Sequence, residues 1–381
     1  MRKGWEYKKL GEVLETTSGG TPSKSHKEYY EGGTIPWLRS GEVSKGDIYD
    51  AELYITEEGL KKSSAKLFPI DTVLIAMYGA TVGQVGILKS TMCTNQAICG
   101  ILPNKDFHPN FLKYVLLANK KNYLKQAMGG AQPNISQQVI KSTYIPIVKF
   151  SEQESVVSEL DKINELIRLK KEQLKDFDNL AQSLFYEMFG DPVENEKGWE
   201  VKKLGDVCTF SQGMQVPIEN QKEIQNEGDV RFLRIIDFTQ GKDAPRYVEC
   251  DNDKYILHEK EIAIVRYGTP GFICTGKIGA IANNLFKLNP VSDNIFVFEY
   301  LVHWLSTDAF QLSIKGKQYG AALQAIKFST IQNIEIILPP LPLQRLFAQR
   351  IEQIEREKSE VQKSIQDLET LLASRMQYWF E

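Results

Sequence analysis

Two segments of this sequence carry apolar side chains at alternating steps of four and three residues, which is the a/d spacing of a coiled coil. Neither segment contains Gly or Pro, and both are bounded by helix-breaking residues, Gly190 after the first and Pro339-Pro340 before the second. The pattern predicts two helices of about 36 residues, each roughly 54 Å long at 1.5 Å per residue. The first series is Val156, Leu160, Ile163, Ile167, Lys170, Leu174, Phe177, Ala181, Leu184 and Met188; the second is Phe347, Ile351, Ile354, Lys358, Val361, Ile365, Leu368, Leu372, Arg375 and Trp379.

Each of these predicted helices needs a partner for its narrow apolar stripe. The other helix of the same chain is the simplest partner, which gives an intramolecular coiled coil. An antiparallel arrangement is expected if a pseudo-two-fold axis relates two halves of the chain. The alternative is that each helix packs on its own globular domain, although such helices usually show a wider apolar face.

The sequence repeats itself along its whole length, in two copies of about 190 residues. The segments GWEYKKLGEV (4–13) and GWEVKKLGDV (198–207) share eight of ten residues. Further on, MYGATVG (77–83) corresponds to RYGTPGF (266–272), GGAQPNIS (129–136) to GAALQAIK (320–327), and SLFYEMF (183–189) to SRMQYWF (374–380). By the same logic Phe380 should lie near Gly4, so we expect the two ends of the chain to be close together.

Each half begins with a globular domain of mixed structure. Apolar runs rich in β-branched residues, at 72–79, 144–148 and 263–268, alternate with Gly, Asn and Asp turns, and helical patterns follow at 110–126 and 299–315. We therefore expect an α+β fold with globular domains at 1–150 and 191–340, and with coiled-coil helices at 151–190 and 341–381.

Composition narrows the class of protein. The chain has 42% hydrophobic and 25% charged residues and no apolar run long enough to span a bilayer or to act as a signal peptide, so a cytoplasmic protein is expected. Its five cysteines lack CxxC spacing, which favours reduced thiols and no metal site. A net charge of −3 means that any anion-binding face is local or is completed by a partner.

Catalytic motifs are missing from the sequence. In GATVGQVGILKS (79–90) the glycines and lysine do not have the spacing of a phosphate-binding loop, and no GxGxxG follows a strand. The four histidines are scattered and have no partner pattern for nucleophilic or metal chemistry; His303, inside a helical pattern, is expected to be a packing or surface residue. The sequence predicts a non-catalytic chain.

Polar loops recur at corresponding points of the two halves and supply candidate DNA-binding residues. Arg can bond guanine edges or phosphates in bidentate fashion, Gly lets a backbone approach closely, and Tyr, Ser, Thr and Gln offer donors and acceptors. Ordinary loop and strand-end chemistry explains each residue better when it is taken alone, and only the recurrence in both halves favours DNA binding. The candidates are Ser18, Gly19, Gly20, Thr21, Lys24, Arg39, Ser40 and Tyr78 in the first half, and Gln212, Arg234, Arg266 and Tyr267 in the second.

Taken together, these segments resemble the specificity subunit of type I restriction–modification systems. The resemblance rests on the repeated GWE-x-KKLG[ED]V line, on SGGTPSKSHKEYYEGGTIPWLRSGEV (18–43), on GGAQPNIS, and on a Pro-rich line that leads through EQ or LQ into a heptad helix. It implies a DNA-reading subunit in which two target recognition domains each bind one half of a split asymmetric sequence.

The resemblance also implies partners and cofactors. Two methyltransferase (modification) subunits would dock on the helices, and two restriction/translocase subunits would add cleavage. S-adenosylmethionine, ATP and Mg²⁺ would bind to those subunits and not to this chain. The helices would act as a ruler, because a spacer of this size suits recognition sites about one DNA turn apart, near 34 to 36 Å. Two alternatives are a coiled-coil scaffold that never touches DNA and the recognition subunit of another split restriction enzyme.

Overall fold

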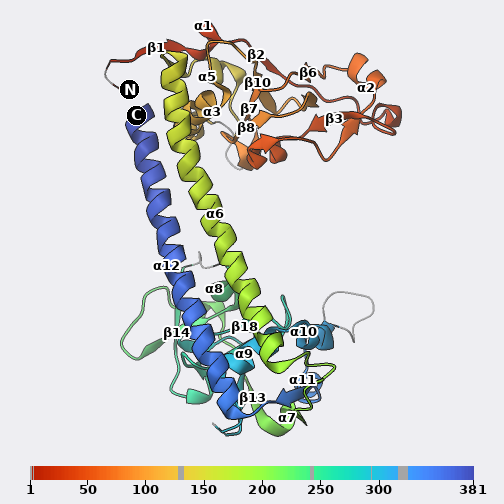
Figure 1. The fold of residues 1–381 in the computed structure, drawn as a ribbon, viewed down its shortest axis with the longest axis vertical. Helices are drawn as coiled ribbons and strands as arrows, with labels where there is room; N and C mark the ends of the chain where they lie inside the picture. The colour runs from red at the N-terminus through yellow and green to blue at the C-terminus, as the bar shows by residue number, and fades with distance from the viewer. Residues whose placement is uncertain (1, 3, 128–132, 241–243, 293, 316–324) are drawn as a thin grey trace. The chain divides into compact units, whose positions relative to one another are not determined.

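The computed structural model describes residues 2, 4–127, 133–240, 244–292, 294–315 and 325–381. Its contacts divide the chain into two compact units: unit 1 combines residues 1–171 with 363–381, and unit 2 comprises residues 172–362. Each unit therefore contains one strand-rich part and a segment of both long helices (Figure 1).

The strand-rich part of unit 1 contains two sheets and a short strand pair. One sheet has the order β2-β10-β7-β8-β4, the second has the order β5-β3-β9-β6, and β1 pairs with β11. The strands are β1 Glu6–Lys9, β2 Thr16–Ser18, β3 Ile35–Leu38, β4 Asp47–Ile48, β5 Tyr54–Ile55, β6 Leu67–Phe68, β7 Val73–Ala76, β8 Val85–Leu88, β9 Met92–Thr94, β10 Ile98–Ile101 and β11 Tyr144–Ile147.

Short helices cover these sheets. The apolar face of α3 supplies Phe111, Leu112 and Val115 to the main core of unit 1, which also contains residues of β7, β8 and β10. The predicted helix at 110–126 is interrupted at Asn119, so it forms α3 and α4. The helices of this part are α1 Leu10–Val13, α2 Glu57–Lys61, α3 Pro109–Ala118, α4 Lys120–Gln126 and α5 Gln137–Lys141, with 3-10 helices η1 Lys27–Tyr29, η2 Ser40–Lys45 and η3 Gly79–Thr81.

Unit 2 repeats this arrangement. The sheet β13-β20-β17-β18 corresponds to β2-β10-β7-β8, the sheet β15-β14-β19-β16 corresponds to β5-β3-β9-β6, and β12 pairs with β21 as β1 does with β11. Its strands are β12 Glu200–Lys203, β13 Cys208–Gln212, β14 Asp229–Leu233, β15 Arg246–Glu249, β16 Ile256–Leu257, β17 Ile262–Val265, β18 Ile273–Cys274, β19 Gly279–Ile281, β20 Leu285–Pro290 and β21 Glu335–Leu338. Its short helices are α7 Leu204–Val207, η4 Ile218–Asn220, α8 Ile235–Thr239, η5 Asp253–Tyr255, α9 Phe298–Ser306, α10 Asp308–Lys315 and α11 Phe328–Gln332.

The long helices are α6 (Phe150–Phe189) and α12 (Leu341–Phe380), each of 40 residues and slightly longer than predicted. Gly190 ends α6 in the left-handed region, at a φ of +78° that favours glycine, and its N–H donates to the carbonyl of Tyr186 at 2.8 Å. Pro342 lies in the first turn of α12, where its missing N–H costs no helical hydrogen bond.

In each unit, the segments of α6 and α12 run antiparallel. In unit 1, Glu159 pairs with Arg375, and Lys171 Nζ lies 2.8 Å from Glu369 Oε1, so residue numbers rise along one helix as they fall along the other. In unit 2, Lys358 Nζ lies 2.8 Å from Asp178 Oδ1, and the ring of Phe347 packs edge-on against that of Phe185, so the numbering again runs in opposite directions. The predicted antiparallel pairing of the helices is confirmed within each unit.

The predicted a/d residues form the inner face of these helices. Twelve of them are buried: Val156, Leu160, Ile163, Ile167, Ala181, Leu184, Met188, Phe347, Ile351, Ile354, Val361 and Ile365. Leu174, Phe177, Leu368 and Leu372 are half-buried. The alternative that the helices pack on their own domains also holds at the helix ends, because Leu160 belongs to the core of unit 1 and Phe347 to that of unit 2.

A fully buried glutamine ties each long helix to the strand-rich part of its unit. Gln153 Oε1 accepts from the backbone N–H of His108 at 2.8 Å, and its Nε2 donates to the carbonyls of Asp106 and Val148. Gln344 makes equivalent contacts in unit 2: its Oε1 accepts from the backbone N–H of Val297 at 2.8 Å, and its Nε2 donates to the carbonyls of Ile295 and Pro339.

The end of α12 packs against the beginning of the chain inside unit 1. The indole of Trp5 stacks on that of Trp379 with centroids 5.9 Å apart, and the guanidinium of Arg2 lies 4.1 Å from the Trp379 ring. Phe380 packs edge-on against Phe111 of α3, at 5.7 Å between centroids. The expected closeness of the chain ends is confirmed for residues 2–5 and 378–380, and Figure 1 shows both ends beside each other.

The five cysteines are free thiols, and four of them are buried. Burial raises the pKa of Cys93 to about 11 and those of Cys99, Cys208 and Cys274 to about 12. These four side chains are therefore protonated, unreactive core residues at neutral pH. In the described part of the chain, no helix combines the length and the apolar character needed to cross a membrane.

Candidate nucleic-acid interface

Four strands of unit 1 end at one place. β2 and β7 both run antiparallel to β10, so that Ser18 pairs with Cys99 and Ala76 with Ile98 at the start of β10. β3 and β9 run parallel and end together, because Leu38 pairs with Thr94. Residues 95–97 connect β9 to β10, so the loops that follow all four strands meet around this segment.

The corresponding strands of unit 2 end in the same way. The last residues of β13 and β17 pair with Phe286 and Leu285 at the start of β20, and the parallel strands β14 and β19 end at Leu233 and Ile281. We call the loops at these ends the strand-end surface. It comprises residues 18–21, 39–40, 77–78 and 95–97 in unit 1, and residues 212–214, 234–235, 266–268 and 282–284 in unit 2.

Nearly all the predicted DNA-binding residues lie on this surface. The structure brings together Ser18, Gly19, Gly20, Thr21, Arg39, Ser40 and Tyr78 in unit 1, and Gln212, Arg234, Arg266 and Tyr267 in unit 2. Lys24 is exposed in the loop that continues from Thr21. Their contact with DNA stays a prediction, but their common location is established.

The glycines of the surface pack against their own domain. Gly20 N–H donates to the carbonyl of Thr94 at 2.9 Å, and a Cβ on Gly19 would lie only 2.6 Å from the carbonyl oxygen of Asn95. In unit 2 a Cβ on Gly213 would lie 2.7 Å from the carbonyl carbon of Ala282. The sequence predicted that these glycines allow a close backbone approach. In the structure the glycines approach residues 94–95 and 281–282 of their own domain, and this contact holds the loops together.

Arg39 of unit 1 is held by acidic neighbours. Its backbone N–H donates to Glu42 Oε1 at 3.1 Å, and its guanidinium pairs with Glu52. Glu42 is almost fully buried and also accepts from Lys45 Nζ at 3.1 Å. The Arg39 side chain itself is half exposed, so its guanidinium is accessible from solvent.

Arg234 of unit 2 has an equivalent acidic neighbour. Asp237 Oδ2 accepts from the backbone N–H of Arg234 at 2.9 Å and from its Nε at 3.1 Å. Asp237 Oδ1 pairs with Arg231, and Lys277 donates to the Asp237 carbonyl. The sequence comparison missed Glu42 and Asp237, although an acidic residue three positions after the arginine recurs in both halves.

Tyrosines and amides complete the surface. The Tyr78 and Tyr267 side chains are both exposed. Tyr267 Oη donates to Asn283 Oδ1 at 3.1 Å, and Gln212 Nε2 donates to the Asn283 carbonyl at 3.1 Å. Thr21 makes a related hydrogen bond to Gln96 in unit 1. These side chains offer donors and acceptors suited to base edges or phosphates.

The segments before α5 and α11 pack beside the tyrosine loops. Ile135 N–H donates to the Met77 carbonyl at 2.9 Å, and Ile326 N–H donates to the Arg266 carbonyl at 2.9 Å. Arg266 Nε also donates to the Ile326 carbonyl at 3.2 Å, so this predicted DNA-binding side chain has a structural partner. Residues 129–132 of GGAQPNIS and 320–324 of GAALQAIK lie outside the described residues.

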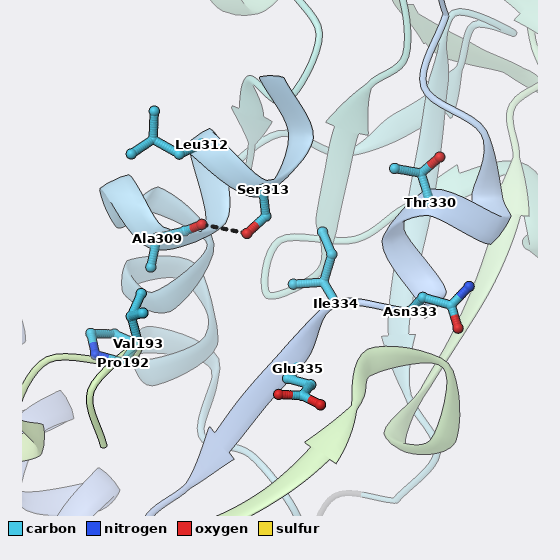
Figure 2. A pocket seen from close by; sticks show the side chains of 9 residues that line it. All are labelled: Pro192, Val193, Ala309, Leu312, Ser313, Thr330, Asn333, Ile334 and Glu335. Atoms are coloured by element: carbon cyan, nitrogen blue, oxygen red, sulfur yellow. Dashed lines mark hydrogen bonds between the residues drawn. The ribbon is translucent and has the colours of Figure 1, made fainter. Parts of the chain in front are cut away.

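Cavities of similar size occur at corresponding places in the two units. The one in unit 2, of about 500 Å³, lies between α10, α11 and the residues after α6 (Figure 2). The one in unit 1, of about 580 Å³, is lined by Lys121, Asn122 and Ser142 among others. Figure 2 shows side chains that point in different directions and include Glu335 as the charged member, which is not an arrangement for acid–base or nucleophilic catalysis. Among the described residues, no His, Cys, Asp and Glu side chains form a group that could hold a metal ion.

Both halves of the chain match one family model, described as type I restriction modification DNA specificity domain, over residues 2–176 and 196–370. The specificity subunit of the type I restriction enzyme MjaIX from Methanocaldococcus jannaschii is 28% identical over 377 residues, covering 91% of this chain and 85% of that protein. The EcoR124I/EcoR124II specificity subunit from Escherichia coli is 30% identical over 166 residues, covering 42% of this chain and 41% of that protein.

Solved structures share the fold. A chain from work on complex assembly and conformational transition of the type I R-M system superposes with a TM-score of 0.65 at 21% identity, covering 100% of this chain and 98% of that chain. The S subunit of a type I system from M. genitalium gives a TM-score of 0.53 at 15% identity, covering 99% and 96%. These likenesses confirm the predicted fold class, and the matches over both halves show that the chain belongs to the family of type I restriction modification DNA specificity domains.

Proposed function

We propose that this chain is the DNA specificity subunit of a type I restriction–modification complex and that each strand-end surface reads one half of a bipartite, asymmetric DNA target. One observation carries the proposal: the same strand ends meet in both units, and the side chains on the two surfaces differ. Beside the shared arginine and tyrosine, unit 1 presents Thr21 and Gln96, whereas unit 2 presents Gln212 and Asn283. A common scaffold with different surfaces suits the recognition of two different half-sites.

The chain itself would supply recognition and no catalysis. Two methyltransferase subunits would dock on α6 and α12, and two restriction/translocase subunits would complete the complex in the cytoplasm, where the host DNA lies. S-adenosylmethionine, ATP and Mg²⁺ would bind to those partners. A target adenine inside a duplex must be flipped out before its amino group can react, which would be the task of the methyltransferase.

Selection from a random duplex library tests the DNA-reading role. The purified chain with its methyltransferase partner should enrich a split motif with an unread spacer. A coiled-coil scaffold that does not read DNA would enrich no motif, and that result would refute the proposal.

Exchanging one domain tests the assignment of the halves. Replacing residues 14–135 by the equivalent segment of another family member should change one half of the motif and leave the other half unchanged. A change in both halves would show that the surfaces do not read independently.

Lengthening the helices tests the ruler. Whole heptads inserted at matching positions of α6 and α12 keep the a/d pairing and should lengthen the spacer between the half-sites. An unchanged spacer would show that the helices do not set the distance.

A further inference from the structure

A buried carboxylate follows the arginine of each strand-end surface at the same distance along the chain. Glu42 lies three residues after Arg39, and Asp237 lies three residues after Arg234. The side chains of these acids are only 5% and 2% exposed. A buried carboxylate needs partners for its charge, and in both units those partners include the neighbouring arginine.

In unit 2 the carboxylate fixes the arginine directly. Asp237 Oδ2 accepts from both the backbone N–H and the Nε of Arg234, at 2.9 and 3.1 Å, while Oδ1 pairs with Arg231. The side chain of Arg234 is 21% exposed. One edge of its guanidinium is therefore bound inside the protein, which sets the direction of the rest of the group.

In unit 1 the carboxylate fixes the backbone and lies near the guanidinium. Glu42 Oε1 accepts from the Arg39 N–H at 3.1 Å and lies 3.8 Å from Arg39 Nε, and Glu42 Oε2 accepts from the Glu52 N–H at 3.0 Å. Arg39 is 49% exposed, so it is held less tightly than Arg234. Both units thus place a buried carboxylate beside the arginine, and the contact with the arginine side chain is closer in unit 2 than in unit 1.

Such a device lowers the entropic cost of binding. A free arginine side chain loses rotamer freedom when it binds a ligand, and a protein that fixes the side chain beforehand removes part of that loss. We propose that Glu42 and Asp237 are positioning residues that hold Arg39 and Arg234 ready to donate to oxygen or nitrogen acceptors of DNA, an inference that rests on the proposed function.

Asp229 provides a matched control for Asp237. It lies at the start of β14, whose other end leads into Arg234 and α8, and its buried carboxylate accepts from Lys222 Nζ at 2.8 Å and from the backbone N–H of Asn226 at 2.9 Å. Asp229→Asn therefore disturbs a buried ion pair of the same kind, away from the strand-end surface. Comparing it with Asp237→Asn separates a positioning role from a purely structural one.

The experiment measures half-site recognition by the complete complex with its methyltransferase partner. We expect Asp237→Asn to weaken binding to the target by about tenfold or more, with relaxed discrimination in one half-site or a smaller salt dependence. Asp229→Asn should leave both properties near the wild-type values. Glu42→Gln should act in the same way on the other half-site and not on the half-site affected by Asp237→Asn.

The natural difference between the units supplies a conservative variant. Because unit 1 uses Glu and unit 2 uses Asp at this position, Asp237→Glu keeps the charge and should retain binding within about threefold. The inference is overturned if Asp237→Asn and Asp229→Asn have equal effects on recognition. If the wild-type complex selects no split motif, the proposed function itself fails, which is a different result.

Discussion

The glycines of the strand-end surface make a strong prediction about recognition. Gly19→Ala should damage the reading of one half-site and leave the other intact, and Gly213→Ala should do the reverse. A Cβ at these positions would lie 2.6 and 2.7 Å from backbone atoms of the next loop, where ordinary contacts begin near 3.4 Å. The added methyl group therefore forces two loops of the surface apart by roughly 1 Å.

The structure sets the size of this effect. Overpacking a tight site costs about 1–3 kcal/mol. In unit 1 the separation also weakens the hydrogen bonds from Gly20 N–H to Thr94 at 2.9 Å and from Gly19 N–H to Ile98 at 3.3 Å. With about 1 kcal/mol for each of these bonds, the local cost is about 3–5 kcal/mol. A shift of this kind should reduce discrimination in the affected half-site by about tenfold or more.

The assay is motif selection by the complete complex, together with hydrogen exchange at the Gly20 and Asn95 amides. Gly41→Ala is the control, because Gly41 lies on the same side of unit 1 next to Ser40 and a Cβ there would meet nothing within 4 Å. If Gly19→Ala and Gly41→Ala read both half-sites equally well, the loop packing does not govern recognition and the reasoning is wrong.

Three further predictions concern stability and affinity. Gln344→Ala should destabilise unit 2 by about 3 kcal/mol in urea unfolding, because it leaves backbone groups of residues 295, 297 and 339 without their buried partner. Gln153→Ala should have the same effect in unit 1. A loss of stability below about 1 kcal/mol would contradict this prediction. Burial lowers the pKa of His303 below 6.5, so the folded state favours the neutral imidazole. The free energy of unfolding should therefore fall as the pH drops from 6.5 through that lowered pKa. In unfolding experiments at a series of pH values, His303→Asn should remove this dependence. Glu52→Gln removes a carboxylate that pairs with Arg39. In a titration at low salt, the affinity for DNA should therefore rise by roughly threefold or more. An unchanged affinity would show that Arg39 does not face the DNA.

The helices and the duplication could be predicted from the sequence because their signals are local or periodic. The a/d series located both long helices, and the repeat led to the antiparallel pairing that Glu159 and Arg375 show in unit 1. His303 was expected to be a packing or surface residue, and its ring does pack edge-on against Phe347 at 5.1 Å between centroids. These features depend on neighbours in sequence or on the repeat itself.

The strand-end surface could be predicted only as a set of residues. The sequence gives no register for the pairing of β3 with β9 or of β7 with β10, so it could not show that Arg39 and Tyr78 belong to loops that meet. The buried partners were harder still, because Glu42 and Asp237 look like ordinary surface acids in the sequence. Only the recurrence of arginine and acid at the same spacing in both copies could have indicated them.

The two units differ in a way that bears on how such a protein acquires a new target. The supporting groups are shared in kind: Gly19 and Gly213 pack against neighbouring loops, Glu42 and Asp237 are buried carboxylates, and the buried Gln153 and Gln344 tie the long helices to the strands. Among the groups that face outward, the arginine and the tyrosine are shared but others are not, since Thr21 bonds Gln96 in unit 1 whereas Gln212 bonds the Asn283 carbonyl in unit 2. Because the outward side chains contribute little to the cores, they can change at small cost in stability, whereas these supporting groups cannot. Substitutions that alter the half-site should therefore accumulate among the outward residues, with the glycines, the carboxylates and the buried glutamines retained.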